Sequence, residues 1–332
     1  ASSFTVDSAT QITATAPAGT GTVNVRVTTP GGTSADTAAD DFIYVPAPTV
    51  TALTPTSGPE AGGTSLVITG TNLTAASAVT FGTTAATAFT VDSATQITAT
   101  APAGTGTVDV QVTTAGGTST NTAADDFTYI AAPTVTALSP STGPEFGGTL
   151  ITISGTNFTG VTSITVGGTT AAPFTVNSAT SISVRVPAGT GIADVIVTAA
   201  GGASANTAAD DFTYVPRPTI TAISPDSGPN AGGTSVVITG TNFNGVTSVT
   251  FGTTAAASFT VDSPTQITAI SPAGTGADDV IVTTAGGTNP NTAADNFIYV
   301  PPPSITALSI NKGLPAGGTT VTISGTNFIG VT

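Results

Sequence analysis

The sequence predicts an all-β chain that is built from tandem β-sandwich domains. Three observations support this fold class: a regular internal repeat, apolar residues that alternate with polar ones, and Gly- and Pro-rich turns between the alternating stretches. No stretch has the apolar period of a helix. Although only 7% of the residues are charged, 39% are hydrophobic and regularly placed, so the composition does not indicate disorder.

The internal repeat defines the domain organisation. Pro48 returns as Pro133, so the period, 133 − 48, is 85 residues, and Asn72 returns with the same step. A unit of this length fits a small autonomous sandwich better than a solenoid repeat. The predicted domains are 48–132, 133–217 and 218–302, preceded by the C-terminal part of a repeat (1–47) and followed by the N-terminal part of one (303–332).

The two partial repeats leave two interpretations open. In the first, the sequence is a window from a longer array. In the second, the last piece of one molecule completes the first piece of the next, which predicts head-to-tail self-association. We favour the window, because the two pieces together lack the equivalent of 248–255, which is a predicted core strand.

The alternation of apolar residues places the strands within a repeat. Val108, Val110 and Val112 point to one side of a strand, and Asp109 and Gln111 point to the other. Short strands separated by turns in this number are typical of an immunoglobulin-like sandwich. The predicted strands of the repeat 48–132 are 48–54, 64–69, 77–82, 86–91, 95–101, 107–112 and 126–130.

Aromatic residues recur at fixed positions of the repeat, which indicates core or interface packing. Phe146 is the exception, because its equivalents are alanines in a Gly-rich turn. We expect Phe146 to be exposed, either as an incidental surface aromatic or as a contact to a neighbour. Tyr44 and its equivalent Tyr129 end the last strand before a junction, and we expect them to pack at the contact between domains.

The junctions between repeats are short and rich in proline, as in Val45–Pro48 and Val300–Pro303. Proline fixes its own φ and restricts the preceding residue, so these linkers should be stiff. Stiff joints and a constant repeat length predict a rod-like array.

Several motifs together resemble the IPT/TIG domain family. They are Gly58–Thr64 (GPEAGGT), Val67–Asn72 (VITGTN), Val79–Gly82 (VTFG) and Ala124–Tyr129 (ADDFTY), and their counterparts occur in every repeat. The resemblance implies an immunoglobulin-like fold that is found in plexin ectodomains, Rel-type transcription factors, some starch-acting enzymes and long bacterial surface proteins. The near-identical repeats fit the bacterial surface proteins best.

Composition excludes several classes of function. The formal charge is −14 with only 4 Lys and Arg, so the clustered basic residues that nucleic-acid binding needs are missing. The chain has no His and no Cys, which removes the usual catalytic bases and nucleophiles. We therefore predict no enzyme and no cofactor. No apolar run reaches the ~20 residues of a membrane-spanning helix, so we predict no membrane insertion in this segment.

An acidic pair stands before the last strand at 40–41, 125–126 and 210–211, becomes Asp295-Asn296 in the repeat 218–302, and is the one candidate metal site. Carboxylate oxygens at this place near the junction are suitable ligands for Ca²⁺. The alternative is that the first Asp ends a loop by accepting bonds from its own backbone. The candidate residues are Asp40, Asp41, Asp125, Asp126, Asp210, Asp211 and Asp295.

One difference between the repeats concerns association. Arg26 and Gln111, which point outward, become Ile196 and Ile281 in the later repeats. Exposed apolar residues on a strand favour lateral association. The alternative is that this face is locally covered.

These observations predict a structural, non-catalytic rod or filament segment of a bacterial extracellular surface protein, which spaces or builds an appendage. The similarity of the repeats supports this, because a recognition site would be expected to make one repeat deviate. The alternative is an adhesin whose repeats bind a host, matrix or glycan ligand, although the aromatic and Arg hot spots of such surfaces are scarce.

Overall fold

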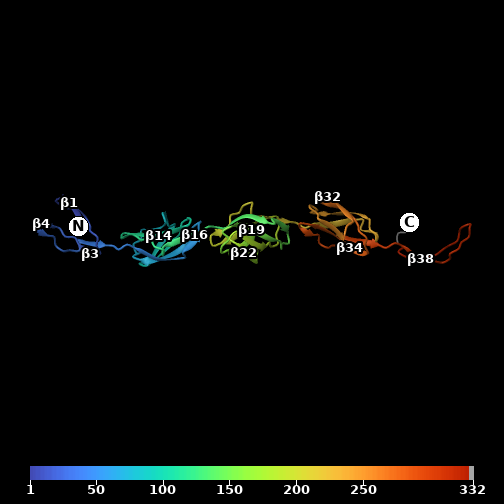
Figure 1. Ribbon diagram of the computed structural model, residues 1–332, viewed down its shortest axis with the longest axis horizontal. Helices are drawn as coiled ribbons and strands as arrows, with labels where there is room; N and C mark the ends of the chain where they lie inside the picture. The colour runs from blue at the N-terminus through green and yellow to red at the C-terminus, as the bar shows by residue number, and fades with distance from the viewer. Residues whose placement is uncertain (329–332) are drawn as a thin grey trace. The chain divides into compact units, whose positions relative to one another are not determined.

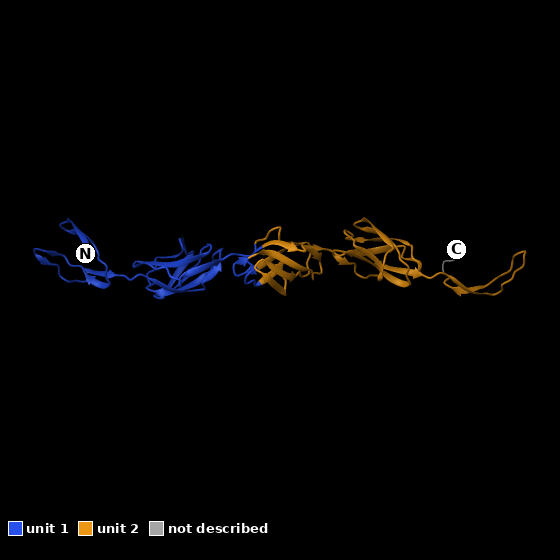
Figure 2. Ribbon diagram, viewed as in Figure 1, with its two compact units in different colours: residues 1–134, 157–162, 198–204 blue, residues 135–156, 163–197, 205–332 orange. Residues whose placement is uncertain are grey.

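The computed structural model describes residues 1–328, and within them every regular element is a β-strand (Figure 1). No helix in this part of the chain has the length and apolar character required to cross a bilayer. The last four residues of the predicted 303–332 piece lie outside the described range. The chain divides into two compact units, residues 1–134, 157–162 and 198–204, and residues 135–156, 163–197 and 205–332 (Figure 2).

The repeat 48–132 consists of two β-sheets. The first sheet has the order β12-β13-β9-β7. Its strands are β7 (Thr49–Thr54), β9 (Ser65–Thr71), β12 (Ala88–Ser93) and β13 (Gln96–Thr100). The second sheet has the order β11-β10-β14-β16-β8, with β15 paired to β14. Its strands are β8 (Ser57–Pro59), β10 (Ala78–Phe81), β11 (Thr84–Ala85), β14 (Thr107–Thr114), β15 (Gly117–Thr118) and β16 (Asp126–Ile130).

The same pair of sheets recurs in the next two repeats. The repeat 133–217 has β17 (Thr134–Ser139), β18 (Thr142–Pro144), β19 (Leu150–Thr156), β20 (Ser163–Val166), β21 (Thr169–Thr170), β22 (Phe174–Ser178), β23 (Ser181–Arg185), β24 (Ile192–Ala199), β25 (Gly202–Ala203) and β26 (Asp211–Val215). The repeat 218–302 has β27 (Thr219–Ser224), β28 (Ser227–Pro229), β29 (Ser235–Thr241), β30 (Ser248–Phe251), β31 (Thr254–Ala255), β32 (Ser258–Ser263), β33 (Gln266–Ile270), β34 (Gly276–Thr284), β35 (Gly287–Thr288) and β36 (Asn296–Val300).

The partial repeats at the two ends of the sequence form small two-stranded sheets. The first piece has β1 (Ser3–Ser8), β2 (Gln11–Thr15), β3 (Gly21–Asn24), β4 (Thr28–Thr29), β5 (Gly32–Thr33) and β6 (Asp41–Tyr44), and the last has β37 (Ser304–Leu308) and β38 (Ile323–Thr326). Phe42 is 41% exposed in the first piece, whereas its equivalent Phe127 is fully buried in a complete repeat. Head-to-tail completion of these pieces stays a prediction.

Each complete repeat has a core between its two sheets. In the repeat 48–132, Ile68 and Ile97 of the first sheet and Val110 and Phe127 of the second are fully buried and belong to one cluster. Burying a side chain of this size contributes about 1.5–3 kcal/mol to stability. The chain has no cysteine, so no disulfide adds to the stability of a repeat. The chain is therefore a series of tandem immunoglobulin-like β-sandwiches, and the strands that the alternating pattern predicts are all present.

Tyr129, the second-to-last residue of β16, packs inside its own repeat, so the expectation that it lies at a contact between domains is wrong. The Tyr129 ring meets Phe127 edge to face, with the ring centroids 5.1 Å apart. Its hydroxyl donates to the carbonyl oxygen of Pro102 at 2.9 Å. A Cβ placed on Gly104 would lie 2.6 Å from the ring, so the turn needs glycine to accommodate the tyrosine. Burial raises the pKa of Tyr129 above its usual value of 10.0.

Candidate functional site

The same contacts recur from repeat to repeat and hold each linker against the repeat that follows it. Asn72 has a positive φ of 59°, and its Nδ2 donates to the carbonyl oxygen of Ala47 in the linker at 3.0 Å. Asparagine tolerates this backbone conformation better than most residues. Its equivalents Asn157, Asn242 and Asn327 also have positive φ and bond the carbonyls of Ala132, Arg217 and Pro302.

A glycine turn approaches the same linkers closely. A Cβ placed on Gly116, in the turn between β14 and β15, would lie 2.3 Å from the carbonyl oxygen of Pro46. The equivalent distances are 2.1 Å between Gly201 and the Ala131 oxygen and 2.2 Å between Gly286 and the Pro216 oxygen. Only glycine allows the turn to pack on the linker backbone in this way. We call the Asn and the Gly of each repeat the linker clamp, which in the repeat 48–132 is Asn72 and Gly116.

The first Asp of each acidic pair closes a loop. Asp125 is fully buried, and its Oδ1 accepts bonds from the backbone nitrogen of Thr122 at 2.7 Å and from the Thr122 hydroxyl at 3.2 Å. This is the alternative role that the sequence suggested for it. The other carboxylate oxygen, Oδ2, is buried and has no hydrogen-bond partner.

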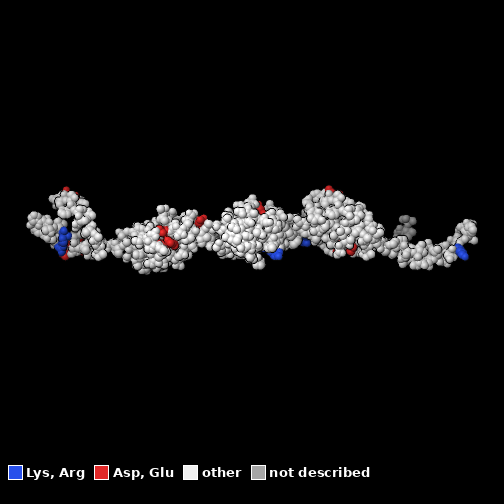
Figure 3. All heavy atoms as spheres, viewed as in Figure 1, with Lys and Arg blue, Asp and Glu red and all other residues white. Residues whose placement is uncertain are grey.

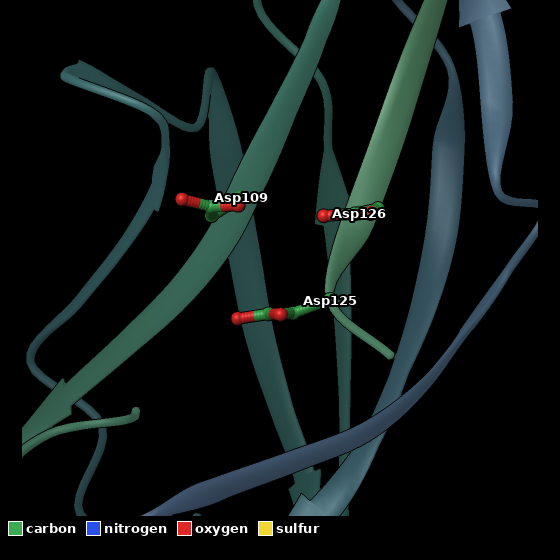
Figure 4. A group of neighbouring side chains, drawn as sticks. All are labelled: Asp109, Asp125 and Asp126. Atoms are coloured by element: carbon green, nitrogen blue, oxygen red, sulfur yellow. The ribbon is translucent and has the colours of Figure 1, made fainter. Parts of the chain in front are cut away.

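The structure brings a third carboxylate to the acidic pair. Asp109 of β14 pairs in register with Asp126 of β16. Carboxylate oxygens of Asp109, Asp125 and Asp126 lie within 4.8 Å of one another (Figure 4). Sequence reasoning noted Asp109 only as an outward residue. The first piece has Asn24 and Asp36 where this repeat has the bonded pair Asp109 and Asn121. This swap could have indicated that positions 109 and 121 touch, but it carries no signal for the contact of Asp109 with the acidic pair.

The repeat 133–217 has the same cluster, formed by Asp194, Asp210 and Asp211. Asp210 is fully buried, and its Oδ2 also lacks a hydrogen-bond partner. Burial, and after it the charge of Asp194, raises the pKa of the Asp211 carboxyl above its ordinary value. In this cluster, the negative charges are therefore close enough to oppose one another's ionisation.

The acidic pairs of the other two segments have different surroundings. In the first piece, the backbone N–H of Thr37 holds the pKa of Asp40 below its ordinary value, with a smaller contribution from Arg26. Asp41 is exposed. In the repeat 218–302, Asp295 is fully buried, and its Oδ2 accepts a bond from Asn289 at 2.8 Å.

The apolar residues that the sequence singled out for association are Phe146, Ile196 and Ile281. Phe146 is 64% exposed, and a Cβ placed on Gly287 would lie 2.8 Å from its ring. Ile196 and Ile281 are both partly buried rather than fully exposed. Ile281 lines a small pocket that also contains Asn289 and Asp295.

Charged side chains are sparse on the repeats, as the face drawn in Figure 3 illustrates. Within residues 1–328, the ion pairs are those of Arg26 with Asp36, at 2.7 Å, and with Asp40, at 3.8 Å. This surface is formed mainly by uncharged residues.

A family model described as IPT/TIG domain matches residues 48–129, 133–214, 218–299 and 303–332. Several solved structures are also similar. The full extracellular region of plexin A4 is 21% identical, over 80% of this chain and 26% of that one, with a TM-score of 0.34. The protein SGBP-B from a complex xyloglucan utilization locus in Bacteroides uniformis is 24% identical, over 58% of this chain and 56% of that one, with a TM-score of 0.24.

The adhesin FdeC of Escherichia coli is 16% identical, over 78% of this chain and 98% of that one, with a TM-score of 0.31. The chain spans less than two thirds of the length of the plexin and of SGBP-B. The family match and the two-sheet repeats agree on the fold.

Proposed function

The chain belongs to the IPT/TIG domain family, and on this premise we propose that it is a structural, non-catalytic segment of a bacterial extracellular surface protein, in which stiffly joined repeats space or build an appendage. The observation that carries the proposal is the linker clamp. The same Asn and Gly positions hold the linker at successive junctions, so the structure repeats the joint as well as the domain.

The clamp supports stiffness through two independent contacts. The Asn72 bond ties the carbonyl of Ala47 to the repeat, and the turn at Gly116 packs on the backbone of Pro46, one residue earlier. Two successive linker residues are therefore held, and Pro46 and Pro48 restrict the rotation that is left. A joint of this kind has less freedom than a Gly/Ser linker of the same length.

The chemistry of the chain supports a non-catalytic role. Without His or Cys, and with a single Lys at position 312, the complete repeats lack the usual nucleophiles and general bases. Domains that fold without disulfides and without metal-binding Cys depend on their apolar cores, and each complete repeat has one. The scarcity of Lys and Arg also suits a surface that does not attract nucleic acid.

Small-angle X-ray scattering of the 332-residue chain tests the stiff joint. We expect the scattering of a stiff elongated particle from the wild type. The triple variant Asn72→Ala, Asn157→Ala and Asn242→Ala should scatter as a more flexible chain with a smaller radius of gyration. Asn177→Ala is the matched control, because Asn177 bonds Ser183 within its own repeat and no linker. Scattering from the wild type like that of freely hinged domains would overturn the proposal.

Two further measurements address location and the adhesin alternative. Immunogold electron microscopy of cells that make the protein should label fibres or projections outside the cell envelope, and labelling confined to the cell interior would contradict the proposal. Saturable binding of the purified chain to immobilised glycans or matrix proteins, abolished by substitutions within one repeat, would instead favour an adhesin.

A further inference from the structure

Two of the repeats contain three carboxylates that no basic side chain neutralises. In the repeat 48–132 these are Asp109, Asp125 and Asp126, with oxygens within 4.8 Å of one another. Within residues 1–328, the ion pairs are all made by Arg26, which lies in the first piece. Three like charges at this spacing disfavour one another unless a cation or protons are bound.

The buried oxygen of Asp125 is a second and independent indication of a ligand. Asp125 has no exposed surface, and its Oδ1 is fully used by Thr122. Its Oδ2 has no hydrogen-bond partner, which is costly for a buried carboxylate oxygen and is rare in folded proteins. Figure 4 shows the side chains of Asp125 and Asp126 extending from the β16 region towards β14, which carries Asp109. The side chain that carries the unpartnered oxygen is therefore a member of the cluster.

The repeat 218–302 shows how the same place is arranged when a neutral donor fills it. Asn289 stands where the repeat 48–132 has Ser119, and its Nδ2 donates to Oδ2 of Asp295 at 2.8 Å. In the same repeat, Asn296 replaces the acid that corresponds to Asp126. One charge is lost and the buried oxygen gains a donor, so this repeat has no need of a cation.

The first piece shows the same place with a cation that the chain itself supplies. Arg26 stands where the repeat 48–132 has Gln111, and its Nε lies 3.8 Å from Oδ2 of Asp40. Asn24 replaces the acid that corresponds to Asp109. Oδ2 of Asp40 also lacks a hydrogen-bond donor, so Arg26 balances its charge only. The first piece thus balances the carboxylate with a cationic side chain and the repeat 218–302 with a hydrogen bond, whereas the other two repeats have neither.

We propose that the remaining two repeats each bind a calcium ion at this place, through Asp109, Asp125 and Asp126 in one and through Asp194, Asp210 and Asp211 in the other. The donor set consists of carboxylate oxygens, which Ca²⁺ and Mg²⁺ prefer, and contains no nitrogen or sulfur ligand. Ca²⁺ accepts irregular geometry and both mono- and bidentate carboxylates, so it fits a site made by two neighbouring strands better than Mg²⁺ does.

The solvent exposure of the three carboxylates determines how tightly the cluster binds calcium. Asp126 is exposed and Asp109 is partly buried, so water completes the coordination on the outer side. An open site with three protein carboxylates belongs to the weak class of extracellular calcium sites, with a Kd on the order of 10⁻⁴–10⁻³ M. The ion joins β14 to the end of the loop before β16, and it therefore strengthens its own repeat.

Equilibrium dialysis of the full chain with radioactive calcium at concentrations up to about 10 mM, roughly ten times the weakest expected Kd, tests the proposal. We expect about two ions per wild-type chain, about one for Asp126→Asn and background binding for Asp126→Asn/Asp211→Asn, because each cluster provides one site. The substitution introduces the residue that the repeat 218–302 has at position 296. Asp41→Asn is the matched control, since Asp41 has the same repeat position in the piece where Arg26 pairs with Asp40, and it should leave calcium binding unchanged.

Hydrogen exchange with mass spectrometry supplies a readout for each repeat. Calcium should slow exchange in peptides from 107–130 and 192–215, leave 276–300 unchanged, and lose its effect in the double variant. Background binding by the wild type would overturn the proposal and would indicate a shared proton or a buried water at the cluster. Undiminished binding by a folded double variant, or equal slowing of the repeat 218–302, would overturn it as well.

Discussion

The serine at position 119 provides a direct test of what the unpartnered oxygen of Asp125 costs. We predict that Ser119→Asn, measured in EDTA, stabilises the repeat 48–132. Asn289 at the equivalent position accepts a bond from Val282 N at 2.7 Å and donates to Oδ2 of Asp295 at 2.8 Å. Ser119 makes the corresponding bond to Val112 N at 3.1 Å, and the Asp125 oxygen remains without a donor.

The expected size of the effect follows from these contacts. A new hydrogen bond to a charged group contributes about 1.5–3 kcal/mol, and ordering the longer side chain costs up to about 1 kcal/mol of it. The net gain is about 0.5–2 kcal/mol, which corresponds to roughly 2- to 30-fold slower hydrogen exchange through opening of the repeat.

Hydrogen exchange of peptides from 107–130 measures this opening. The reverse substitution, Asn289→Ser, should accelerate exchange in 276–300 by a similar factor, because it leaves the Asp295 oxygen unpartnered. In calcium the gain from Ser119→Asn should shrink, since the amide and the ion compete for one oxygen. If Ser119→Asn leaves exchange unchanged in EDTA while the variant is folded, the unpartnered oxygen carries no appreciable cost and the reasoning is refuted.

Three further outcomes are expected. Tyr129→Phe leaves the Pro102 carbonyl without its donor, so the repeat 48–132 should lose about 0.5–1.5 kcal/mol in hydrogen exchange, and an unchanged rate would contradict the role of that bond. Burial raises the pKa of Tyr129, Tyr214 and Tyr299 in the folded chain, so these hydroxyls ionise at lower pH in the unfolded chain. The free energy of unfolding should therefore be constant from neutral pH to about pH 9 and fall above about pH 10. Tyrosinate absorbance should therefore rise together with the loss of β-structure in circular dichroism; ionisation near pH 10 of a chain that stays folded would argue against it. Ile196→Thr/Ile281→Thr should reduce any concentration-dependent association seen in sedimentation velocity, and equal association of the variant would rule out this face.

The repeat, the strands and the fold class could be predicted because they depend on local patterns. The alternation of Val108, Val110 and Val112 identifies a strand whatever it pairs with. By contrast, the three-residue strand β8 includes Gly58 and Pro59, has no alternation, and exists because it pairs with β16. Such a strand has no signal of its own in the sequence.

The candidate site was only partly accessible for the same reason. The pair Asp125 and Asp126 is adjacent in sequence and could be found, whereas Asp109 joins it through the register of β14 and β16, which adjacency cannot give. The tyrosine prediction failed on a similar point. Its position next to the linker suggested a contact between domains for Tyr129, but its ring packs against Gly104, some 25 residues away in sequence.

The parallel pairing of β8 with β16 decides how a repeat would carry tension. β8 lies near the start of the repeat and β16 at its end, and the two run in the same direction, with Ser57 opposite Thr128 and Pro59 opposite Ile130. A pull applied at both ends of the chain therefore draws these strands past each other along their length. The bonds that join them, such as Thr128 N to the Thr56 oxygen and Glu60 N to the Ile130 oxygen, are loaded in shear and must break together. Antiparallel strands joined by a hairpin and pulled apart at their open end would instead unzip one bond at a time.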